Sequence, residues 1–422
     1  MNYGEAVEYI HSMNWKKIHL NLDRVFELAR MMGNPEKGMK FVHIGGTNGK
    51  GSVSSLLTAI LRAAGYKVGT YTSPDLKRLN ERIQIDGLPI PDADFARITE
   101  KMRGIIEGMA DKPSTFEALT MMGFEYFREQ RCDVVVLEVG LGGDLDATNI
   151  IREPLVSVIT GVDYDHMHIL GDNLAEIAEI KAGIIKPGRP VVFGGEAREV
   201  LPVFERVARE RGSELFVADY GEIREAEFSL SGSRFDYKGR GGLELSLAGI
   251  YQPKNAAVAI ETVEVLNKYG FSVSEEALRA GLAAAKWPAR FEVLSRAPLV
   301  IYDGGHNAQG VRACVESIEA ILPGQKVNVV TGILKDKDRA AAISEIGKIA
   351  RKVYAVEAED PRALGSEEYA REFREVGIAA EACGKVREGL KRALADAREN
   401  DAPVLVVGSL HLYAEVSDFL KK

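Results

Sequence analysis

Residues 41–65 read FVHIGGTNGKGSVSSLLTAILRAAG, in which an apolar run is followed by a glycine-rich turn with one lysine and then by a helical pattern. The apolar face of that pattern is formed by Leu56, Leu57, Ile60 and Leu61. A turn of this kind directs backbone amides and the positive end of the helix dipole at an anion, and Lys50 adds a mobile positive charge. The stretch therefore predicts a phosphate-binding loop within an α/β fold.

The loop departs from the general Walker pattern at two positions. Ile44 stands where the first glycine of the pattern belongs, and Gly51 separates Lys50 from Ser52. The physical elements remain, because the glycine-rich turn, the lysine and the following hydroxyl are all present. A strand-to-helix turn that binds no ligand is the alternative, and the lysine and serine argue against it.

The composition is that of a globular protein. With 422 residues, 46% of them hydrophobic and 27% charged, the chain is long enough for two domains with separate cores. It has no apolar run of about eighteen residues, and its N-terminal MNYGEAVEYIHSMNWKK lacks the pattern of a signal peptide. We therefore expect a cytoplasmic protein without a membrane partner, acting as a monomer.

Charge and cysteine content exclude further classes. A formal net charge of −8 argues against a broad nucleic-acid surface, which needs clustered Lys and Arg. Cys132, Cys314 and Cys383 are far apart, which indicates free thiols instead of a disulfide framework or a clustered zinc site. Any anionic ligand must then be held locally, by loop amides, a helix N-terminus or a divalent metal.

Apolar β-branched runs alternate with helical patterns along the chain, which predicts βαβ units around a buried, mostly parallel sheet. The polar, glycine-rich stretch 219–247 favours a small antiparallel insertion. Near KWPARFEVLSRAP a second series of strands and helices begins. We expect one domain over residues 1–290 and a smaller Rossmann-like domain over residues 298–422.

Acidic side chains follow two of the predicted strands. Glu138 ends the run VVVLE, where open α/β sheets bind ligands, and a carboxylate there can hold Mg²⁺ or cap a neighbouring helix. Asp163, Asp165 and His166 follow the run LVSVITGV. Because histidine is an uncommon Mg²⁺ ligand, chemistry alone leaves zinc or a structural histidine open here.

Lys181 lies among apolar residues at helical spacing in NLAEIAEIKAGIIKPG. An ammonium on such a core face is costly unless it is paired or chemically changed. A lysine that extends to the surface or pairs with an acid is the ordinary outcome.

Ten motifs in this order resemble the folylpolyglutamate synthase and dihydrofolate synthase family, which belongs with the Mur ligases. They are HIGGTNGKGS, YTSPDLKRLNERIQIDG, STFEALTMMGFEYF, LEVGLGGDLDATN, DHMHILGDNLAEIAEIKAGI, YQPKNAAVAI, WPARFEVL, DGGHNAQG, GILKDKD and VLVVGSL. The resemblance implies an N-terminal P-loop ATPase-type domain and a C-terminal glutamate ligase domain. It also implies transfer of the γ-phosphoryl group of ATP to a folate or dihydropteroate carboxylate and attack of the amine of L-glutamate on the acyl phosphate.

The resemblance also implies the site residues. The ATP phosphates would bind to Gly49, Lys50, Gly51 and Ser52. A first Mg²⁺ would bind to Ser73 and Glu138, and a second to His166 beside a carbamylated Lys181. The nucleotide would also contact Asn255, Arg290 and Asp303, the last two from the linker and the second domain. The pterin side of the acceptor would be lined by Thr115, Phe116, Glu117, Leu145, Asp146 and Ala147.

Three positions depart from the family pattern, and the first two of them lie near the acceptor end. Asp144 replaces a common arginine after GLGG, Asp75 replaces a frequent histidine in the TSP loop, and Ala308 replaces a proline after DGGHN. The first two motivate an alternative, a Mur-type ligase with a non-folate carboxylate acceptor. A P-loop ATPase that drives a partner is a second alternative. A nicotinamide-binding protein is disfavoured, because the chain lacks GxGxxG at the loop.

Overall fold

The computed structural model describes residues 1–13, 21–195 and 198–421. The chain forms two compact units, the first comprising Met1–Ile223 and Lys254–Ala285 and the second Arg224–Pro253 and Lys286–Lys422. Within the described residues, no helix combines the length and apolarity needed to cross a membrane. Cys132, Cys314 and Cys383 are free thiols, as predicted.

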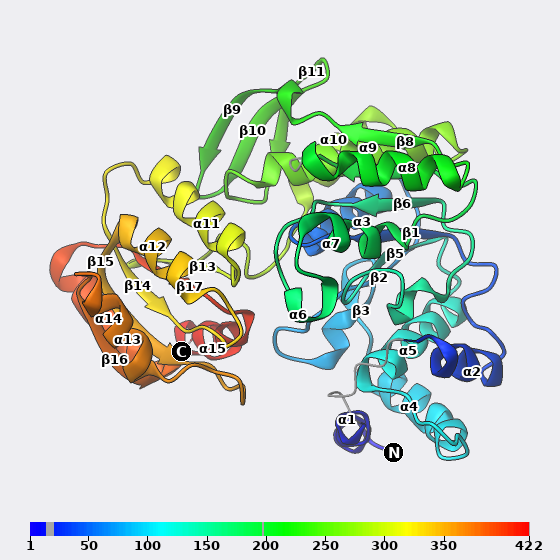
Figure 1. The fold of residues 1–422 in the computed structure, drawn as a ribbon, viewed down its shortest axis with the longest axis horizontal. Helices are drawn as coiled ribbons and strands as arrows, with labels where there is room; N and C mark the ends of the chain where they lie inside the picture. Colours follow the sequence, from blue (N-terminus) through cyan, green and yellow to red (C-terminus); the bar gives the residue numbers. More distant parts are fainter. Residues whose placement is uncertain (14–20, 196–197, 422) are drawn as a thin grey trace. The chain divides into compact units, whose positions relative to one another are not determined.

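The first unit is built on an eight-stranded sheet with the order β4-β3-β2-β5-β1-β6-β7-β8. Figure 1 labels several of these strands, among them the central β1 and its neighbours β5 and β6. Strands β2, β5, β1, β6, β7 and β8 pair in parallel in that order. Strands β3 and β4 add an antiparallel edge next to β2. The central strand β1 is buried along its whole length, as expected for a parallel strand covered on both faces. The bounds are β1 Phe41–Gly45, β2 Val68–Tyr71, β3 Ile83–Ile85, β4 Leu88–Pro89, β5 Val134–Glu138, β6 Val156–Ile159, β7 Val191–Gly194 and β8 Leu215–Ala218.

Helices cover both faces of this sheet. One apolar core joins α1, α2, α4 and α5 to strands β1, β2 and β5, and another joins α7 and α8 to β6 and β7. Helix α10 packs so closely on α3 that a Cβ at Gly281 would overlap the backbone of Ile60. The bounds are α1 Tyr3–Ser12, α2 Asp23–Met31, α3 Lys50–Ala63, α4 Asp92–Ile106, α5 Thr115–Glu129, α6 Met167–Leu170, α7 Leu174–Ala182, α8 Leu201–Glu210, α9 Gln252–Lys268 and α10 Glu275–Ala284.

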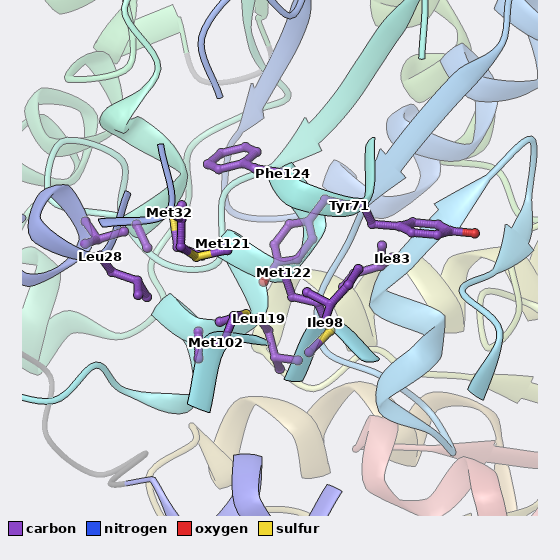
Figure 2. Packing of buried hydrophobic residues seen from close by; sticks show 14 of the residues in the cluster. Leu28, Met32, Tyr71, Ile83, Ile98, Met102, Leu119, Met121, Met122 and Phe124 are labelled. Carbon is purple, nitrogen blue, oxygen red and sulfur yellow. The ribbon is translucent and has the colours of Figure 1, made fainter. Parts of the chain in front are cut away.

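Figure 2 shows the first of these cores, in which methionine and aromatic side chains converge. Met102 from α4, Met121 and Met122 from α5, and Tyr71 from β2 are all fully buried. Burying one side chain of this size stabilises the fold by roughly 1.5–3 kcal/mol, and unbranched methionines fill irregular gaps between helices. This core fixes α5 against β2, and so positions the N-terminus of α5 beside the end of that strand.

The second unit contains a six-stranded sheet with the order β12-β13-β17-β14-β15-β16, parallel except for the β12–β13 pair. Its apolar core includes side chains of α11, α12 and α13. The bounds are β12 Glu292–Arg296, β13 Leu299–Asp303, α11 Ala308–Ile321, β14 Val327–Thr331, α12 Arg339–Ile349, β15 Ala350–Glu357, α13 Ser366–Glu375, β16 Ala380–Lys385, α14 Val386–Asn400, β17 Val404–Val407 and α15 Tyr413–Leu420. The predicted fold class is confirmed: a mostly parallel α/β sheet and a separate, smaller α/β unit.

The predicted antiparallel insertion is a three-stranded sheet of β9 Ile223–Ser229, β10 Gly232–Tyr237 and β11 Arg240–Leu245, in which β10 and β11 pair antiparallel. By its contacts this segment belongs to the second unit, where Leu230 packs against the core. This division differs from the predicted domain limits of 1–290 and 298–422, which stay a prediction.

Candidate functional site

The predicted phosphate loop joins β1 to α3 through two glycines in the left-handed region. Gly46 has φ 140° and Gly49, the N-cap of α3, has φ 85°. A Cβ at Gly46 would overlap Thr160 Oγ1, and one at Gly49 would overlap Oδ1 of Asn255 in α9. Both backbone angle and close approach therefore require glycine. The predicted residue Asn255 thus lies directly against the predicted loop.

Residues that follow β6 hold this loop from the side. The Thr47 amide donates to Gly161 O at 2.9 Å, and its hydroxyl donates to Asp163 O at 3.1 Å. The Thr160 hydroxyl donates to Asn48 O at 2.6 Å. Sequence reasoning did not identify Thr47 and Thr160 as supports, because contacts across more than a hundred residues depend on β1 and β6 being neighbours.

Lys50 and Ser52 occupy the first turn of α3. The Lys50 amine donates to Gly46 O at 3.0 Å and to Thr47 O at 3.2 Å, so that it folds back over the loop. Ser52 is buried. The loop amides, the α3 N-terminus and the lysine together form a cradle suited to phosphate oxygens.

Glu138 and Ser73 lie at the carboxyl ends of neighbouring strands. Glu138 ends β5 and is buried, and it pairs in register with Ile44 of β1. Ser73 follows β2, which pairs with β5 through Tyr71 and Leu137. A carboxylate and a hydroxyl are thus placed at the same edge of the sheet as the phosphate loop, where parallel sheets bind ligands.

Lys181 lies near the end of α7 with only 3% of its surface exposed. Burial, followed by the positive charge of Lys50, lowers the pKa of Lys181 to about 7, and Asp165 acts in the opposite direction. The backbone at Lys181 contacts Gly143 closely, where any Cβ would be crowded. The predicted lysine therefore lies close to both the phosphate-loop lysine and the segment after Glu138.

His166 precedes the short helix α6 and adopts left-handed backbone angles, φ 49° and ψ 35°. Its amide donates to Asp165 Oδ1 at 2.9 Å, and its Nε2 lies 3.9 Å from the same oxygen. A non-glycine residue in this conformation is uncommon and is held here by the Asp165 side chain. Asp165, which also influences Lys181, links the two predicted residues.

The segment after Glu138 packs against the N-terminus of α5. Phe116 is half-buried and lies so close to Gly140 that a Cβ there would overlap its ring. Leu145 is 41% exposed, whereas Ala147 is buried. Phe116 and Tyr71 pack edge to face with their ring centroids 6.1 Å apart. An apolar wall with an accessible face therefore adjoins the polar strand ends.

The Asp146 carboxylate is buried and fully engaged with its own loop. Its Oδ2 accepts hydrogen bonds from Gly140 N at 3.1 Å and Leu141 N at 3.0 Å, and its Oδ1 accepts from Thr148 N at 3.0 Å and Thr148 Oγ1 at 2.6 Å. Burial raises the pKa of Asp146, and these four donors act against that rise. The carboxylate stabilises the turn that presents Leu145.

Thr115 and Glu117 also make local contacts. The Thr115 hydroxyl donates to Ile10 O at 3.1 Å. Glu117 forms a capping box with Ser114 and an ion pair with the buried Arg24, with an N–O distance of 3.0 Å. Of the predicted acceptor-side residues, Phe116 and Leu145 therefore offer free apolar surface, and the polar ones brace the fold.

Arg290 and Asp303 lie together in the second unit. Arg290 Nη1 donates to Ala289 O at 3.0 Å, and its positive charge lowers the pKa of Asp303 against the larger rise caused by burial. Asp303 Oδ2 accepts from the hydroxyl of Tyr251 at 2.6 Å and from the Phe291 amide at 2.9 Å. Tyr251 is a partner that sequence reasoning did not identify.

The structure gives a local explanation for each of the three residues that depart from the family pattern. Asp75 accepts a 2.7 Å hydrogen bond from Arg82 Nε, so its negative charge is compensated. Asp144 is exposed and caps the amide of Leu145 at 2.8 Å. Ala308 is the first residue of α11, a position that accepts proline and alanine alike.

Two matches to family models define the class. Residues 44–263 match the Mur ligase middle domain, and residues 289–410 match the Mur ligase, glutamate ligase domain. The chain is therefore a Mur-type protein.

Relatives and a solved structure narrow the family. Over its whole length the chain is 37% identical to folylpolyglutamate synthase of Lacticaseibacillus casei, covering 99% of that protein. It is 34% identical to dihydrofolate synthase/folylpolyglutamate synthase of Bacillus subtilis, covering 99% of each chain. A solved complex of folylpolyglutamate synthase (FPGS) with the ATP analogue AMPPCP and folate superposes on this structure with a TM-score of 0.88. The two chains are 36% identical, and each is covered in full. The chain belongs to the folylpolyglutamate synthase and dihydrofolate synthase family, which confirms the predicted resemblance.

Proposed function

We propose that this protein is an ATP-dependent amide ligase that joins L-glutamate to the carboxylate of a folate or dihydropteroate acceptor through an acyl phosphate. The observation that carries the proposal is the full-length match to relatives named for these two activities. The FPGS complex with AMPPCP and folate supports ATP and a folate as substrates. The half-buried Phe116 packs on Gly140 after β5, the neighbour of the phosphate-loop strand β1, and Leu145 on the same segment is exposed; apolar surface of this kind fits a flat aromatic acceptor.

The chemistry needs a phosphoryl transfer between two anions. The loop amides, with Gly49, Gly51 and Ser52 at the start of α3, would hold the phosphate oxygens. Lys50 would exchange its two loop carbonyls for a phosphate oxygen, a change that strengthens its hydrogen bonds because both partners are then charged. Catalysis then consists of positioning and charge neutralisation, with no protein nucleophile. We also propose that Asn255, Arg290 and Asp303 contact the nucleotide.

The donor set at the strand ends suits Mg²⁺. The described residues contain no cluster of three or more His, Cys, Asp or Glu side chains that would form a closed metal cage. Mg²⁺ in ATP-dependent enzymes uses one or two carboxylates together with phosphate oxygens and water, so Glu138 and Ser73 are sufficient for one ion. A second ion would be held by His166 and a carbamate on Lys181. Bound Mg²⁺ neutralises negative charge on the phosphates.

We propose that Lys181 is carbamylated in the active enzyme. Burial and the positive charge of Lys50 bring its pKa to about 7, so that a large share of the amine is neutral at physiological pH. The neutral Nζ attacks the carbon of carbon dioxide and forms one N–C bond, while one C–O π bond breaks and its electron pair moves to the oxygen. The nitrogen then loses one proton to water, which leaves the carbamate anion. The product replaces an unfavourable buried ammonium by an anion that a divalent cation stabilises.

Phosphate release tests the function. With ATP, Mg²⁺ and L-glutamate, we expect turnover that depends on dihydropteroate or tetrahydrofolate. We expect Lys50→Ala and Glu138→Ala to abolish that turnover. As a control, Lys37→Ala should leave it unchanged, because Lys37 is exposed and precedes β1, the strand that leads into the phosphate loop. Equal turnover without acceptor and glutamate would identify an uncoupled ATPase instead. Glutamate-dependent turnover only with other carboxylates would identify a different Mur-type acceptor.

Carbamylation has its own test. Incubation with ¹³C-bicarbonate should give a carbamate carbon signal that is present in the active protein and missing from Lys181→Ala. We expect Lys181→Ala to lose most activity and to regain part of it with short carboxylates that fill the vacated space. A fully active Lys181→Ala variant would contradict the proposal.

A further inference from the structure

His43 is a buried polar residue that the mechanism above does not use. It lies in β1, three residues before the phosphate loop, and is fully buried. Its Nε2 lies 2.9 Å from Thr148 Oγ1, and that hydroxyl lies 2.6 Å from Asp146 Oδ1. Thr148 belongs to the 3₁₀ helix η2, Ala147–Ile150, which follows the segment containing Leu145. A continuous buried chain therefore joins the central strand to the segment beside the apolar wall.

The direction of each hydrogen bond follows from counting protons. Asp146 accepts three backbone amides, those of Gly140, Leu141 and Thr148, and amide donors favour a carboxylate over a carboxylic acid. The single hydroxyl proton of Thr148 is therefore donated to Asp146, and His43 must donate Nε2–H to Thr148 Oγ1. The Nδ1 atom of His43 is then an unprotonated acceptor, and it makes no hydrogen bond within the described residues.

The surroundings keep the imidazole neutral. Burial, followed by the positive charge of Lys186, lowers the pKa of His43 to about 3. The ring therefore stays neutral near pH 7, and the hydrogen-bond count above places its single proton on Nε2. The ring therefore acts as a hydrogen-bond donor to Thr148 at neutral pH.

We propose that His43 is a positioning residue that holds residues 140–148, here called the acceptor segment, against the strand that carries the phosphate loop. The inference rests on the proposed function, because it assigns this segment to the acceptor. Two further contacts hold the same segment: Gly140 lies against Phe116, and Gly143 lies against the backbone of Lys181. Fixing the segment to β1 holds the acceptor-binding surface in place before the acceptor arrives, so releasing it adds an ordering cost that weakens acceptor binding.

The test uses the full chain and paired variants. His43→Leu removes the donor and Thr148→Val removes the connecting hydroxyl, whereas His43→Gln keeps a donor of similar reach. Thr99→Val is the matched control, because it deletes an equally buried hydroxyl, bonded to Phe95 O at 2.8 Å, in α4. The readouts are the KM for the pterin acceptor, the Kd for AMPPCP, the melting temperature and hydrogen exchange over the acceptor segment.

We expect His43→Leu and Thr148→Val to raise the acceptor KM about tenfold, which corresponds to about 1.4 kcal/mol, and to leave the AMPPCP Kd within about twofold. The double variant should be no worse than either single one, because both break the same chain. His43→Gln should restore most of the acceptor affinity. Both disruptive variants should speed hydrogen exchange at residues 140–148, whereas Thr99→Val should lower the melting temperature alone.

The outcomes separate the two ideas. If the wild-type enzyme is active and both His43→Leu and Thr148→Val have the same acceptor KM as the wild type, the positioning role is wrong. Unchanged exchange over the acceptor segment overturns it as well, whether or not the enzyme is active. A wild-type protein that turns over ATP without any acceptor dependence contradicts the proposed function, and hydrogen exchange then still decides whether His43 holds the segment.

Discussion

Lys181 lies on an apolar helix face, where burial of its positive charge lowers the stability of the fold. Of the apolar neighbours that its spacing predicts, Ile177, Ala178, Ile184 and Ile185 are buried and Leu174 is half-buried. An ordinary structural lysine would extend to water, but 97% of this one is shielded by the fold. The protein therefore retains a group at this position that weakens its own folding, which is typical of functional sites.

Replacing Lys181 by methionine should stabilise the protein without substrates. The pKa is about 7 in the folded state and 10.5 in the unfolded state, so between these values the unfolded chain binds more protons and wild-type stability falls as the pH decreases. The penalty reaches about 4 kcal/mol at pH 7 and vanishes near pH 10.5. Urea unfolding in degassed buffer with a chelator should show Lys181→Met to be more stable at pH 7, by up to this amount, and equal to wild type at pH 10.5.

An exposed lysine provides the control for this prediction. Lys37→Met should show the same dependence of unfolding free energy on pH as the wild-type protein. A Lys181→Met variant that is less stable than wild type at pH 7, or whose advantage does not change with pH, would show that the buried ammonium is not penalised. The same variant should lack ligase activity.

At the scale of elements, the start of α3 depends on glycine for two separable reasons. Gly49 and Gly65, at the two ends of α3, have nearly equal angles, φ 85° and φ 88°. A Cβ at Gly49 would meet Asn255, whereas one at Gly65 would have no atom within 4 Å. The pair therefore separates backbone strain from steric contact with the site.

Gly65→Ala should cost about 1–2 kcal/mol of stability and leave activity unchanged, because only the left-handed backbone is strained. Gly49→Ala should cost more and should weaken AMPPCP binding about tenfold or further, because Asn255 and the loop must move apart. Calorimetry of nucleotide binding and urea unfolding measure both effects. Equal losses of affinity in the two variants would show that the contact with Asn255 is unimportant.

The sequence predicts the elements of the site better than their contacts. The loop, the strand ends at Glu138 and the core face of Lys181 follow from glycine placement and periodicity, which act over a few residues. The contact of Thr160 with Asn48 and that of Gly140 with Phe116 follow from the order of strands and the docking of α5. No local pattern encodes these, and none distinguishes Asp146 as a brace from Asp146 as a ligand.

At the scale of the whole molecule, the first unit is discontinuous in sequence. Residues 224–253 belong to the second unit, whereas α9 and α10 return to the first. Composition marks the change near Pro288 and predicts the antiparallel insertion over residues 219–247. It does not indicate to which unit the insertion belongs, because a polar antiparallel sheet can pack on either unit. Within the second unit, Ile250 N donates to Ser317 Oγ at 3.1 Å and Tyr251 donates to Asp303.

This arrangement predicts which fragment folds. A chain that ends after Pro288 retains residues 224–253 without their partners Ser317 and Asp303, and we expect it to aggregate. A chain that ends at Ala285 and carries a short flexible linker in place of residues 224–253 should fold cooperatively. Circular dichroism, thermal unfolding and limited proteolysis of the two fragments measure the difference. Equal behaviour of both would show that the segment needs no partner.

The close packing of Gly281 on Ile60 has a consequence for synthesis on the ribosome. Helix α3, which follows the phosphate loop, emerges early, but α10, which covers it, is made more than two hundred residues later. A nascent chain emerges at about 5–20 residues per second, so the apolar surface of α3 stays uncovered for roughly ten seconds or more. During that interval the half-made protein is a natural client for chaperones that shield exposed hydrophobic helices.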